Sequence, residues 1–432
     1  MDKRQDKVDK IFKAPRGTQD YLPEKATLLH HLDQKAAKLF EKAGYRRIVT
    51  PTFEETGLFQ RSIGESSDIV RKEMYTFEDR KGRSLTLRPE ATAPVVRAYI
   101  ERNLQAEIQP VKLYYMGPMY RYERPQAGRY REFWQLGIEA IGSSVALIDA
   151  EVIVALMQYL KELGLKEITL HIGSMGDDNC RLDYIKELTR YLELRLDSLC
   201  GDCKERVRLN ALRVFDCKRE PCKQQLKGAP KLIEYLCHEC DEHFKSVKRL
   251  LKEAGVDFVV DPTLVRGFDY YTRTTFEVKS PLLGSQDALG GGGRYDRLVK
   301  QYGGPDSPAI GFALGIERII LALEKEGVKT KVKKEIGLFI IAIDESTKER
   351  AFKLLTELRE ADFSAEMDYL SRSVKAQMKL ADRLGARYVV IVGPDELERD
   401  EVRLKDMRTS SEENIEISEI ASYLLKKKED GE

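Results

Sequence analysis

The sequence predicts an α+β protein that is followed by a separate α/β domain. Residues 85–140 show the alternation and the turn residues of strands, and amphipathic helices stand on either side of them. A polar linker follows at 324–335, and beyond it strands and helices alternate to the end of the chain. With 432 residues, the chain can form roughly two to four domains that each bury a core.

The first predicted helix covers 26–44, where apolar residues recur at helical spacing and Gly44 marks the end. The next segment, YRRIVTPTFEE at 45–55, is rich in strand-forming residues and contains Pro51. Because proline cannot donate in a sheet ladder, this strand suits a sheet edge or an interface. A second long helix is predicted over 146–164.

The residues from about 175 to 255 are charged, helical in pattern, and contain all seven cysteines. We interpret them as a subdomain inserted into the first domain. Strand signals resume at 258–278 and 285–315, and an apolar helix at 319–323 closes the unit. The predicted domains are therefore 1–328, including the insertion, and 334–432.

Composition restricts the class of protein only weakly. The 73 basic and 72 acidic residues nearly cancel, so any basic surface for nucleic acid must be local. The sequence contains no secretion signal and no run of about 18 apolar residues, which predicts a soluble, cytoplasmic protein without a membrane partner. Seven clustered cysteines indicate metal ligands or free thiols rather than a secreted disulfide framework.

The stretch GPMYRYERPQAGRYREFWQLGIEA at 117–140 reads as a charged β-hairpin. At a period of two, Leu136, Ile138 and Ala140 face one side of the sheet, and Gln135 and Glu139 face the other. The glycine between the two polar residues leaves a gap in which a small ligand could lie. A solvated sheet face with surface ion pairs is the alternative for an isolated hairpin.

Three arginines lie on separate stretches of the chain. Arg121 lies on the hairpin, Arg266 in LVRGFDYYTRTTFEV, and Arg318 at the start of a helix in PAIGFALGIERIILAL. The glycine run of ALGGGGRYDRLV lacks the ending of a Walker loop. We therefore predict a polyphosphate site made of side chains, because guanidinium groups suit phosphate oxygens.

Taken together, these stretches resemble the class II aminoacyl-tRNA synthetases, and among them the histidyl-tRNA synthetases of bacterial type. RRIVTPTFEE is similar to motif 1, the hairpin to motif 2 and GFALGIERI to motif 3, while TLRPEAT and LVRGFDYYTRT resemble the two histidine-specific signatures. The resemblance covers nearly the whole chain. It implies an antiparallel catalytic sheet with flanking helices, a C-terminal anticodon-binding domain and a homodimer.

The resemblance also implies roles for single residues. Glu90, Thr92 and Gln135 would bind the α-amino group of histidine, and Glu139 with Tyr271 would bind its imidazole. The full set expected around histidine is Glu90, Ala91, Thr92, Gln135, Glu139, Arg266, Tyr270 and Tyr271, with Ala91 standing where the family usually has glycine. The ATP set is Arg121 at the α-phosphate, Glu123 at the adenine and Arg318 at the γ-phosphate; Arg121, Arg266 and Arg318 form the catalytic set.

The implied activity is the activation of L-histidine by ATP, with Mg²⁺, and transfer of the histidyl group to the 3′ end of tRNA(His). A non-catalytic, synthetase-like regulatory subunit of histidine biosynthesis is the alternative, although such proteins resemble the catalytic core alone. A zinc-dependent nucleic-acid-binding module would rest on the cysteines only and would leave the polar pocket unexplained.

The cysteines of the insertion include two CxxC pairs, Cys200/Cys203 and Cys237/Cys240, which could supply four thiolates to one zinc ion. Cys217 and Cys222 compete for the same role, and free thiols are the other possibility. In the C-terminal domain, four basic residues fall at near-helical spacing and could face tRNA phosphates: Arg372, Lys375, Lys379 and Arg383.

Overall fold

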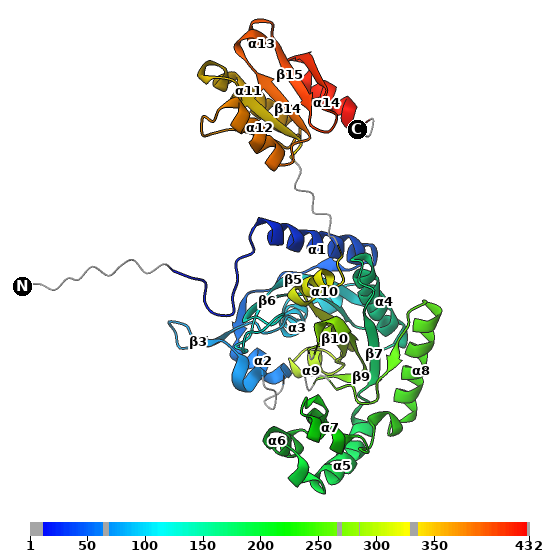
Figure 1. Cartoon of the computed structure of the whole chain (residues 1–432). Helices are drawn as coiled ribbons and strands as arrows, with labels where there is room; N and C mark the ends of the chain where they lie inside the picture. The colour runs from blue at the N-terminus through cyan, green and yellow to red at the C-terminus, as the bar shows by residue number, and fades with distance from the viewer. Residues whose placement is uncertain (1–11, 64–68, 266–269, 285, 329–335, 430–432) are drawn as a thin grey trace, which may run out of the picture. The chain divides into compact units, whose positions relative to one another are not determined.

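A computed structural model describes residues 12–63, 69–265, 270–284, 286–328 and 336–429. The chain divides into two units, Met1–Thr330 and Lys331–Glu432, each with its own hydrophobic core (Figure 1). No helix among the described residues is long and apolar enough to cross a membrane.

The first unit is built on an eight-stranded sheet with the order β1-β5-β6-β11-β10-β9-β7-β8. Five neighbouring pairs are antiparallel, and the end strands β1 and β8 pair in parallel with their neighbours. This mainly antiparallel sheet with flanking helices confirms the predicted fold class. The strands are β1 (Arg46–Arg47), β5 (Val111–Tyr120), β6 (Glu132–Ile141), β7 (Thr169–Ser174), β8 (Val259–Val260), β9 (Thr272–Lys279), β10 (Ala288–Arg294) and β11 (Ala309–Gly315).

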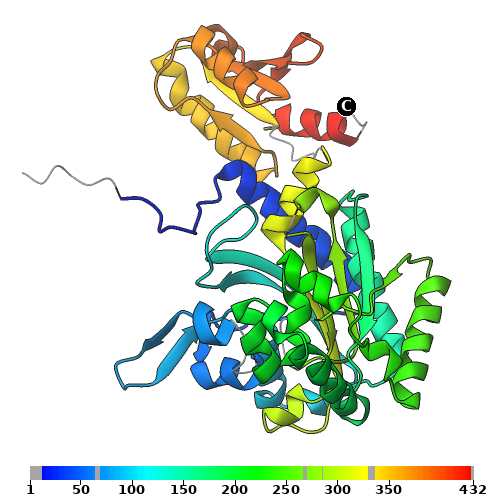
Figure 2. The ribbon, with the colours of Figure 1, turned by 60° about the horizontal axis from the view of Figure 1, so that its bottom comes forward.

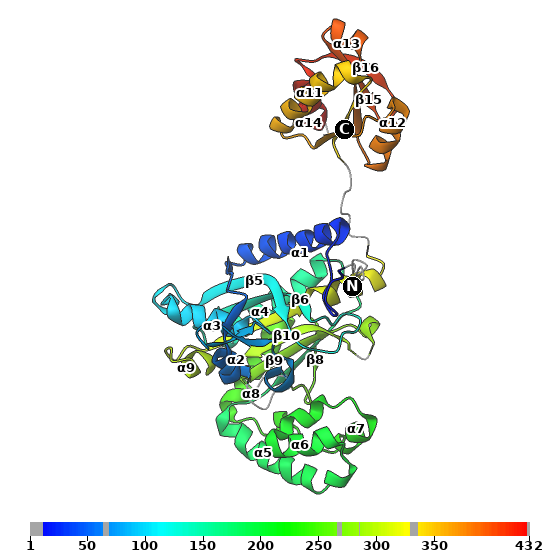
Figure 3. The same cartoon turned by 90° about the vertical axis from the view of Figure 1, so that its left-hand side faces the viewer.

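One face of this sheet is covered by helices whose apolar sides form the largest core. Figure 3 shows α1 lying across β5 and β6. Leu136, Ile138 and Ala140 of β6 are buried in this core, so the predicted alternation of the hairpin is confirmed. The covering helices are α1 (Pro23–Lys42), α4 (Ala146–Glu162), α8 (His238–Glu253) and α10 (Ile316–Lys325).

Smaller elements border the other face. A three-stranded sheet of β2 (Phe53–Glu55), β4 (Ser84–Leu87) and β3 (Thr76–Glu78) precedes α3 (Thr92–Glu101). Arg88 turns toward the backbone, where its Nη1 donates to the Thr50 carbonyl at 2.8 Å and its Nε to the Pro118 carbonyl at 2.9 Å. This arginine therefore ties the motif 1 segment to the hairpin. The remaining elements of this region are α2 (Thr56–Ile63), η1 (Ile69–Glu73), η2 (Leu104–Ala106) and α9 (Leu298–Gln301), whereas η6 (Pro281–Leu283) packs against α10.

The insertion leaves the sheet after β7 and returns to it at β8. Figure 1 shows its helices as a lobe below the sheet, with α8 running back along the core, and in the turned view of Figure 2 the lobe comes to the front. Its apolar side chains join a second core that also reaches Tyr270 and Tyr271. The lobe consists of α5 (Asp178–Glu193), η3 (Leu196–Ser198), α6 (Gly201–Leu209), η4 (Ala211–Asp216), α7 (Glu220–Leu226) and η5 (Leu232–Glu234).

The second unit has a five-stranded sheet of order β13-β12-β14-β15-β16. Its first three strands are parallel, as the predicted alternation of strands and helices requires, and the last two are antiparallel. The elements are β12 (Leu338–Ala342), η7 (Glu345–Thr347), α11 (Lys348–Glu360), β13 (Ala365–Met367), α12 (Val374–Arg383), β14 (Tyr388–Val392), α13 (Pro394–Glu398), β15 (Glu401–Asp406), β16 (Glu412–Glu416) and α14 (Ile420–Glu429).

Candidate active site

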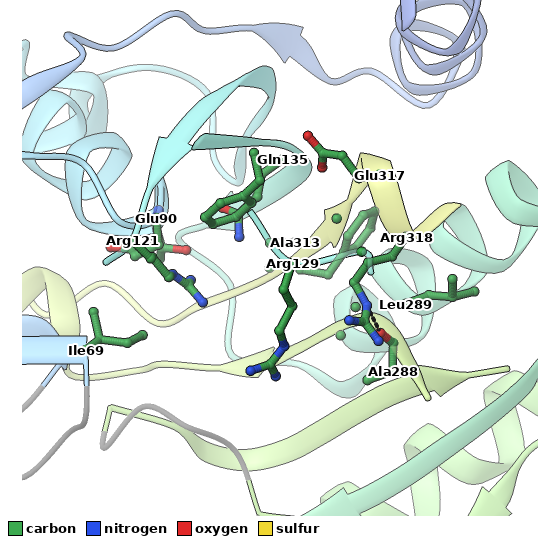
Figure 4. A pocket seen from close by; sticks show the side chains of 18 of the residues that line it. Ile69, Glu90, Arg121, Arg129, Gln135, Ala288, Leu289, Ala313, Glu317 and Arg318 are labelled. Carbon is green, nitrogen blue, oxygen red and sulfur yellow. Dashed lines mark hydrogen bonds between the residues drawn. The ribbon is translucent and has the colours of Figure 1, made fainter. Parts of the chain in front are cut away.

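A cavity of about 340 Å³ lies on the face of the large sheet opposite the main core, between the β5–β6 hairpin, β10, β11 and the start of α10 (Figure 4). Ala91 is buried just before α3 and does not line this cavity, and Arg266 lies outside the described residues. The remaining sequence-predicted residues all line the cavity: Glu90, Thr92, Arg121, Glu123, Gln135, Glu139, Tyr270, Tyr271 and Arg318.

Glu139 lies at the closed end of the cavity and is only 1% exposed. Its Oε1 accepts a hydrogen bond from the Thr92 hydroxyl at 2.7 Å, and its Oε2 accepts one from the Tyr295 hydroxyl at 2.5 Å. Burial raises the pKa of Glu139 to about 8, against the lowering effect of these two donors. The carboxyl therefore changes its charge near neutral pH.

Two glycines allow this packing. Gly311 pairs with Glu139 across the sheet, and a Cβ at Gly311 would lie 1.8 Å from Oε2 of the glutamate. Beside Gly137, the hydroxyl of Tyr115 comes so close that a Cβ there would lie 2.3 Å from it. The predicted gap at Gly137 is thus filled by a tyrosine, and the open cavity lies beside it.

Glu90 serves first as a helix cap. Its carboxylate accepts the backbone N–H groups of Thr92 at 2.6 Å and Ala93 at 3.0 Å, which satisfies two donors of the first turn of α3. Its burial raises the pKa of the carboxyl. Gln135 is also buried, and its Oε1 has no hydrogen-bond partner among the described residues. A buried acceptor on a cavity wall indicates a place for a donor on a ligand.

Three tyrosines complete the closed end. The rings of Tyr270 and Tyr271 lie 4.7 Å apart between centroids, and those of Tyr270 and Tyr295 lie 5.7 Å apart. Burial raises the pKa of Tyr270 and of Tyr295, so these two hydroxyls remain protonated at neutral pH. The sequence reasoning missed Tyr295, although the residue directly follows the glycine-rich strand in GGGGRYD.

Cationic side chains line the open end. Arg121 donates from Nε to the Pro89 carbonyl at 2.9 Å and lies over the Phe133 ring at 5.2 Å. Arg318 donates from Nε to the Ala288 carbonyl at 2.5 Å, which fixes its direction. Figure 4 shows both guanidinium groups, and that of Arg129 between them, directed into the same opening.

Arg129 and Glu123 form an ion pair of 3.0 Å at the rim of this opening. Burial lowers the pKa of Arg318, and the nearby positive charge of Arg129 adds to the effect. Three cations around one opening repel one another, so a bound polyanion would relieve that repulsion. The sequence reasoning missed Arg129, which lies in the hairpin turn and could have been recognised only by its place in that turn.

Glu317 was also missed. Its Oε1 accepts the Tyr21 hydroxyl at 2.6 Å and the Trp134 backbone N–H at 2.8 Å. This carboxylate, one residue before Arg318, joins the segment preceding α1 to the hairpin and to α10. It therefore holds three parts of the cavity wall in register.

The structure corrects the expected zinc quartet. Cys200 and Cys203 group with Cys217 and Cys222, while Cys237 and Cys240 group with Asp177 and Cys180. The two CxxC pairs lie at the starts of α6 and α8, and each pair converges with other ligands than those of the other pair.

Comparison with known proteins agrees with this geometry. The family model described as histidyl-tRNA synthetase matches residues 17–177 and 185–319, and the model of the anticodon binding domain matches 337–427. A relative named histidine–tRNA ligase from Halothermothrix orenii is 50% identical over 96% of this chain and 99% of its own length. One from Natranaerobius thermophilus is 48% identical over 93% of this chain and 96% of its own.

The solved structure of apo histidyl-tRNA synthetase from S. aureus is 39% identical and superposes with a TM-score of 0.82, covering 96% of this chain and 100% of that one. The predicted family is thereby confirmed. With the cavity, the hairpin and the C-terminal unit in place, the chain belongs to the histidyl-tRNA synthetase family.

Proposed function

We propose that the cavity binds histidine at its closed end and ATP at its cationic end, forms histidyl-adenylate, and then charges the 3′ end of tRNA(His). The observation that carries this proposal is the buried Glu139 carboxyl, held by Thr92 and Tyr295 in the same cavity as Arg121 and Arg318. One end can thus recognise a small polar side chain while the other holds phosphates.

Histidine recognition rests on the closed end. Glu139 and Tyr271 bind the imidazole, whose two ring nitrogens need an acceptor and a hydroxyl partner. The α-amino group lies among Glu90, Thr92 and Gln135, where the unpartnered Gln135 Oε1 accepts one of its N–H groups. An amino acid without ring nitrogens leaves buried polar groups unpaired, which rejects it by as much as ~10⁴ to 10⁵.

In the first step, the histidine carboxylate attacks the α-phosphorus of ATP and pyrophosphate leaves. No general base is needed, because the attacking carboxylate is already ionised. Negative charge that develops on the phosphoryl oxygens is stabilised by Arg121, with Arg266 expected beside it, while Arg318 holds the γ-phosphate and Glu123 the adenine side. In the second step, a terminal ribose hydroxyl of the tRNA attacks the adenylate carbonyl and AMP leaves.

ATP reacts as its magnesium complex. Mg²⁺ usually takes one or two carboxylates together with phosphate oxygens and water. Glu123, Glu277 and Asp287 all exert their negative charge on Arg318, so carboxylates stand near the expected phosphate position and fit such an ion. When bound, Mg²⁺ would neutralise part of the triphosphate charge.

The activity is tested by histidine-dependent ATP–pyrophosphate exchange, measured across the twenty amino acids. Arg121→Ala should lower the exchange rate by about 10² to 10³, the usual cost of one lost charge-stabilising contact. Arg102→Ala, on the exposed end of α3, is the matched control and should exchange normally. Near-normal exchange in Arg121→Ala, or equal exchange with another amino acid, contradicts the proposal.

We propose a division of labour between residues 1–328, with their insertion at about 175–255, and residues 334–432. None of the described residues that line the cavity belongs to the second unit. On α12, Lys375, Lys379 and Arg383 are exposed and can face phosphates, whereas Arg372 is held by Asp368 at 2.5 Å. The unit would therefore bind the anticodon region of tRNA.

A chain ending near residue 328 tests this division. It should keep histidine-dependent exchange but lose most tRNA charging, and charging by the full chain should weaken with salt more steeply than exchange. Circular dichroism and light scattering establish first that the shortened chain is folded and assembled as the full chain is. Equal loss of both activities in such a protein would mean that the second unit supports the cavity.

We also propose a homodimer formed through the motif 1 region. Val49 and Ile108 are 81% and 94% exposed near the short edge strand β1, and an exposed apolar surface of this kind favours a partner. A two-fold pair is the commonest assembly. Light scattering should give a mass about twice 49.5 kDa, and a mass near 49.5 kDa would contradict the dimer.

A further inference from the structure

The seven cysteines form two separate groups in the inserted lobe. Group A is Cys200, Cys203, Cys217 and Cys222, and group B is Asp177, Cys180, Cys237 and Cys240. Within each group, the four potential ligand atoms all lie within 4.8 Å of one another. A structural zinc site has four protein ligands, so each group contains the number of ligand atoms that one zinc ion needs.

The spacing of the sulfur atoms fits one metal ion better than a covalent bond. All seven cysteines are free, and Sγ of Cys200 lies 3.9 Å from Sγ of Cys217. A disulfide requires about 2.05 Å. Four thiolates at a Zn–S distance of about 2.3 Å stand about 3.8 Å apart in a tetrahedron. The groups are therefore close to the geometry that one ion imposes.

Three of the four pairs of ligands lie at the start of a helix. Cys200 precedes α6 and Cys203 lies in its first turn, and the same holds for Cys237 and Cys240 at α8. Asp177 caps α5, with Cys180 in its first turn. The partial positive charge of a helix N-terminus stabilises thiolate and carboxylate, which are the forms that bind metal.

Group B shows a close approach that hydrophobic packing alone does not require. Cys180 lies so near Gly176 that a Cβ there would be 2.6 Å from its sulfur. Sγ of Cys180 and of Cys237 lie 3.5 Å and 3.8 Å from the Asp177 carboxylate. These contacts bring two sulfur atoms and a carboxylate around one point, which is an arrangement of metal ligands as well as of weak thiol hydrogen bonds.

We propose that the lobe binds two structural Zn²⁺ ions, one in group A through four cysteines and one in group B through three cysteines and Asp177. Group A joins α6, α7 and the segment between them, so its ion would hold the lobe together. Small helical lobes with little core of their own commonly depend on such an ion.

Group B has a second consequence because of its position beside the catalytic sheet. Arg181, on the helix capped by Asp177, donates to the carbonyl of Tyr271 at 2.5 Å and to that of Met175 at 2.9 Å. Arg273 bonds through its backbone to Met175 and Gly176 at 2.6 and 2.7 Å. An ion in group B would therefore position the backbone of Tyr271 at the closed end of the cavity.

The test is the metal content of the full chain, purified without chelator under reducing conditions. Elemental analysis should find about two zinc ions per chain, about one in Cys203→Ser or Cys240→Ser, and almost none in the double variant. Lys204→Ser, beside Cys203 on α6, is the matched control and should keep two. These counts do not depend on activity.

Cobalt supplies a second measurement if a variant folds poorly. Co²⁺ added to the metal-free wild-type chain should give the visible absorption of tetrahedral thiolate sites at two equivalents. If the chain contains no zinc and Co²⁺ gives no such absorption, the proposal is wrong. If the wild type holds a single ion that both variants lose, there is one site and not two. If the bound metal is iron, the assignment to zinc is wrong.

The position of group B gives a further readout, which rests on the histidine site proposed above. Cys240→Ser should raise the KM for histidine more than Cys203→Ser does, because group B adjoins Arg181, which donates to the Tyr271 carbonyl, and group A does not. If both variants lose one ion but neither changes this KM, the ions are structural and the link to the cavity is wrong. If the zinc counts are as expected but neither the wild type nor any variant activates histidine, the proposed function is wrong and the metal sites are still supported.

Discussion

The two ends of the cavity differ in how far they exclude water. At the closed end, Gln135, Glu139 and Tyr271 are at most 8% exposed, and Glu139 is held by side chains from α3 and from the residue following β10. At the open end, the side chains of Arg121 and Arg129 are 18% and 41% exposed and pair with Glu123 or with backbone carbonyls. One end is desolvated and the other keeps contact with water.

The difference teaches how selectivity and charge stabilisation can be separated within one cavity. A buried polar group that loses its partner costs free energy, so the closed end can reject a wrong side chain. The charge of a polyphosphate is the same whichever amino acid is bound beside it. Several partly solvated arginines can therefore bind the polyphosphate without the close fit that the closed end requires. Changes at the closed end should therefore alter the choice of amino acid, and changes at the open end should alter the use of ATP.

Glu139→Gln should have the largest effect. The amide cannot offer two acceptor oxygens to the imidazole and its neighbours, and we expect kcat/KM for histidine to fall on the order of 10³. The KM for ATP should change little. Glu162→Gln, on the exposed end of α4, serves as control. A normal kcat/KM for histidine in the Glu139 variant would mean that the closed end does not select the amino acid.

Arg318→Ala and Arg129→Ala should sharpen the description of the open end. Arg318 is more buried and is fixed by the Ala288 carbonyl, so its loss should lower kcat/KM for ATP by about 10², against about tenfold for the more exposed Arg129. Both variants should keep the preference for histidine over other amino acids. Pyrophosphate exchange at varied ATP measures this, and a reversed order would show that exposure does not govern the contribution.

Tyr295→Phe should have a smaller effect at the closed end. It removes one hydroxyl donor to Glu139 and leaves the ring, so kcat/KM for histidine should fall by about tenfold. Because that donor lowers the pKa of Glu139, its loss should raise this pKa further. The pH profile of kcat/KM for histidine should therefore shift to higher pH, and an unshifted profile would mean that Tyr295 only packs.

The smallest expected effect is on stability. The folded chain keeps the Glu139 proton up to about pH 8, whereas an ordinary glutamate releases it near 4.5. The folded state therefore binds more protons between these values, and its stability from this group falls as pH rises through that window. Glu139→Gln avoids the loss, so its Tm should exceed that of the wild type at pH 9 but not at pH 5. A Tm difference that is equal at both pH values would contradict the raised pKa.

Much of the molecule was predictable from local pattern. The alternation of β6 separated Leu136, Ile138 and Ala140 from Gln135 and Glu139, and the structure confirms that separation. The motif segments predicted the fold class and the family, both confirmed by the matching models and relatives. The alternation of a strand and the residues of a motif depend only on residues that are neighbours in the chain. The sequence alone therefore determined both.

Contacts between distant residues were decided only by the tertiary structure. Glu139 meets Tyr295 across 156 positions of sequence, and Glu317 meets Tyr21 across 296. Nothing in local spacing shows that Tyr115 fills the space beside Gly137, or that the Cys200 and Cys237 pairs join different groups. Spacing along a chain limits which residues can share an element, but the packing of elements against one another decides which side chains meet.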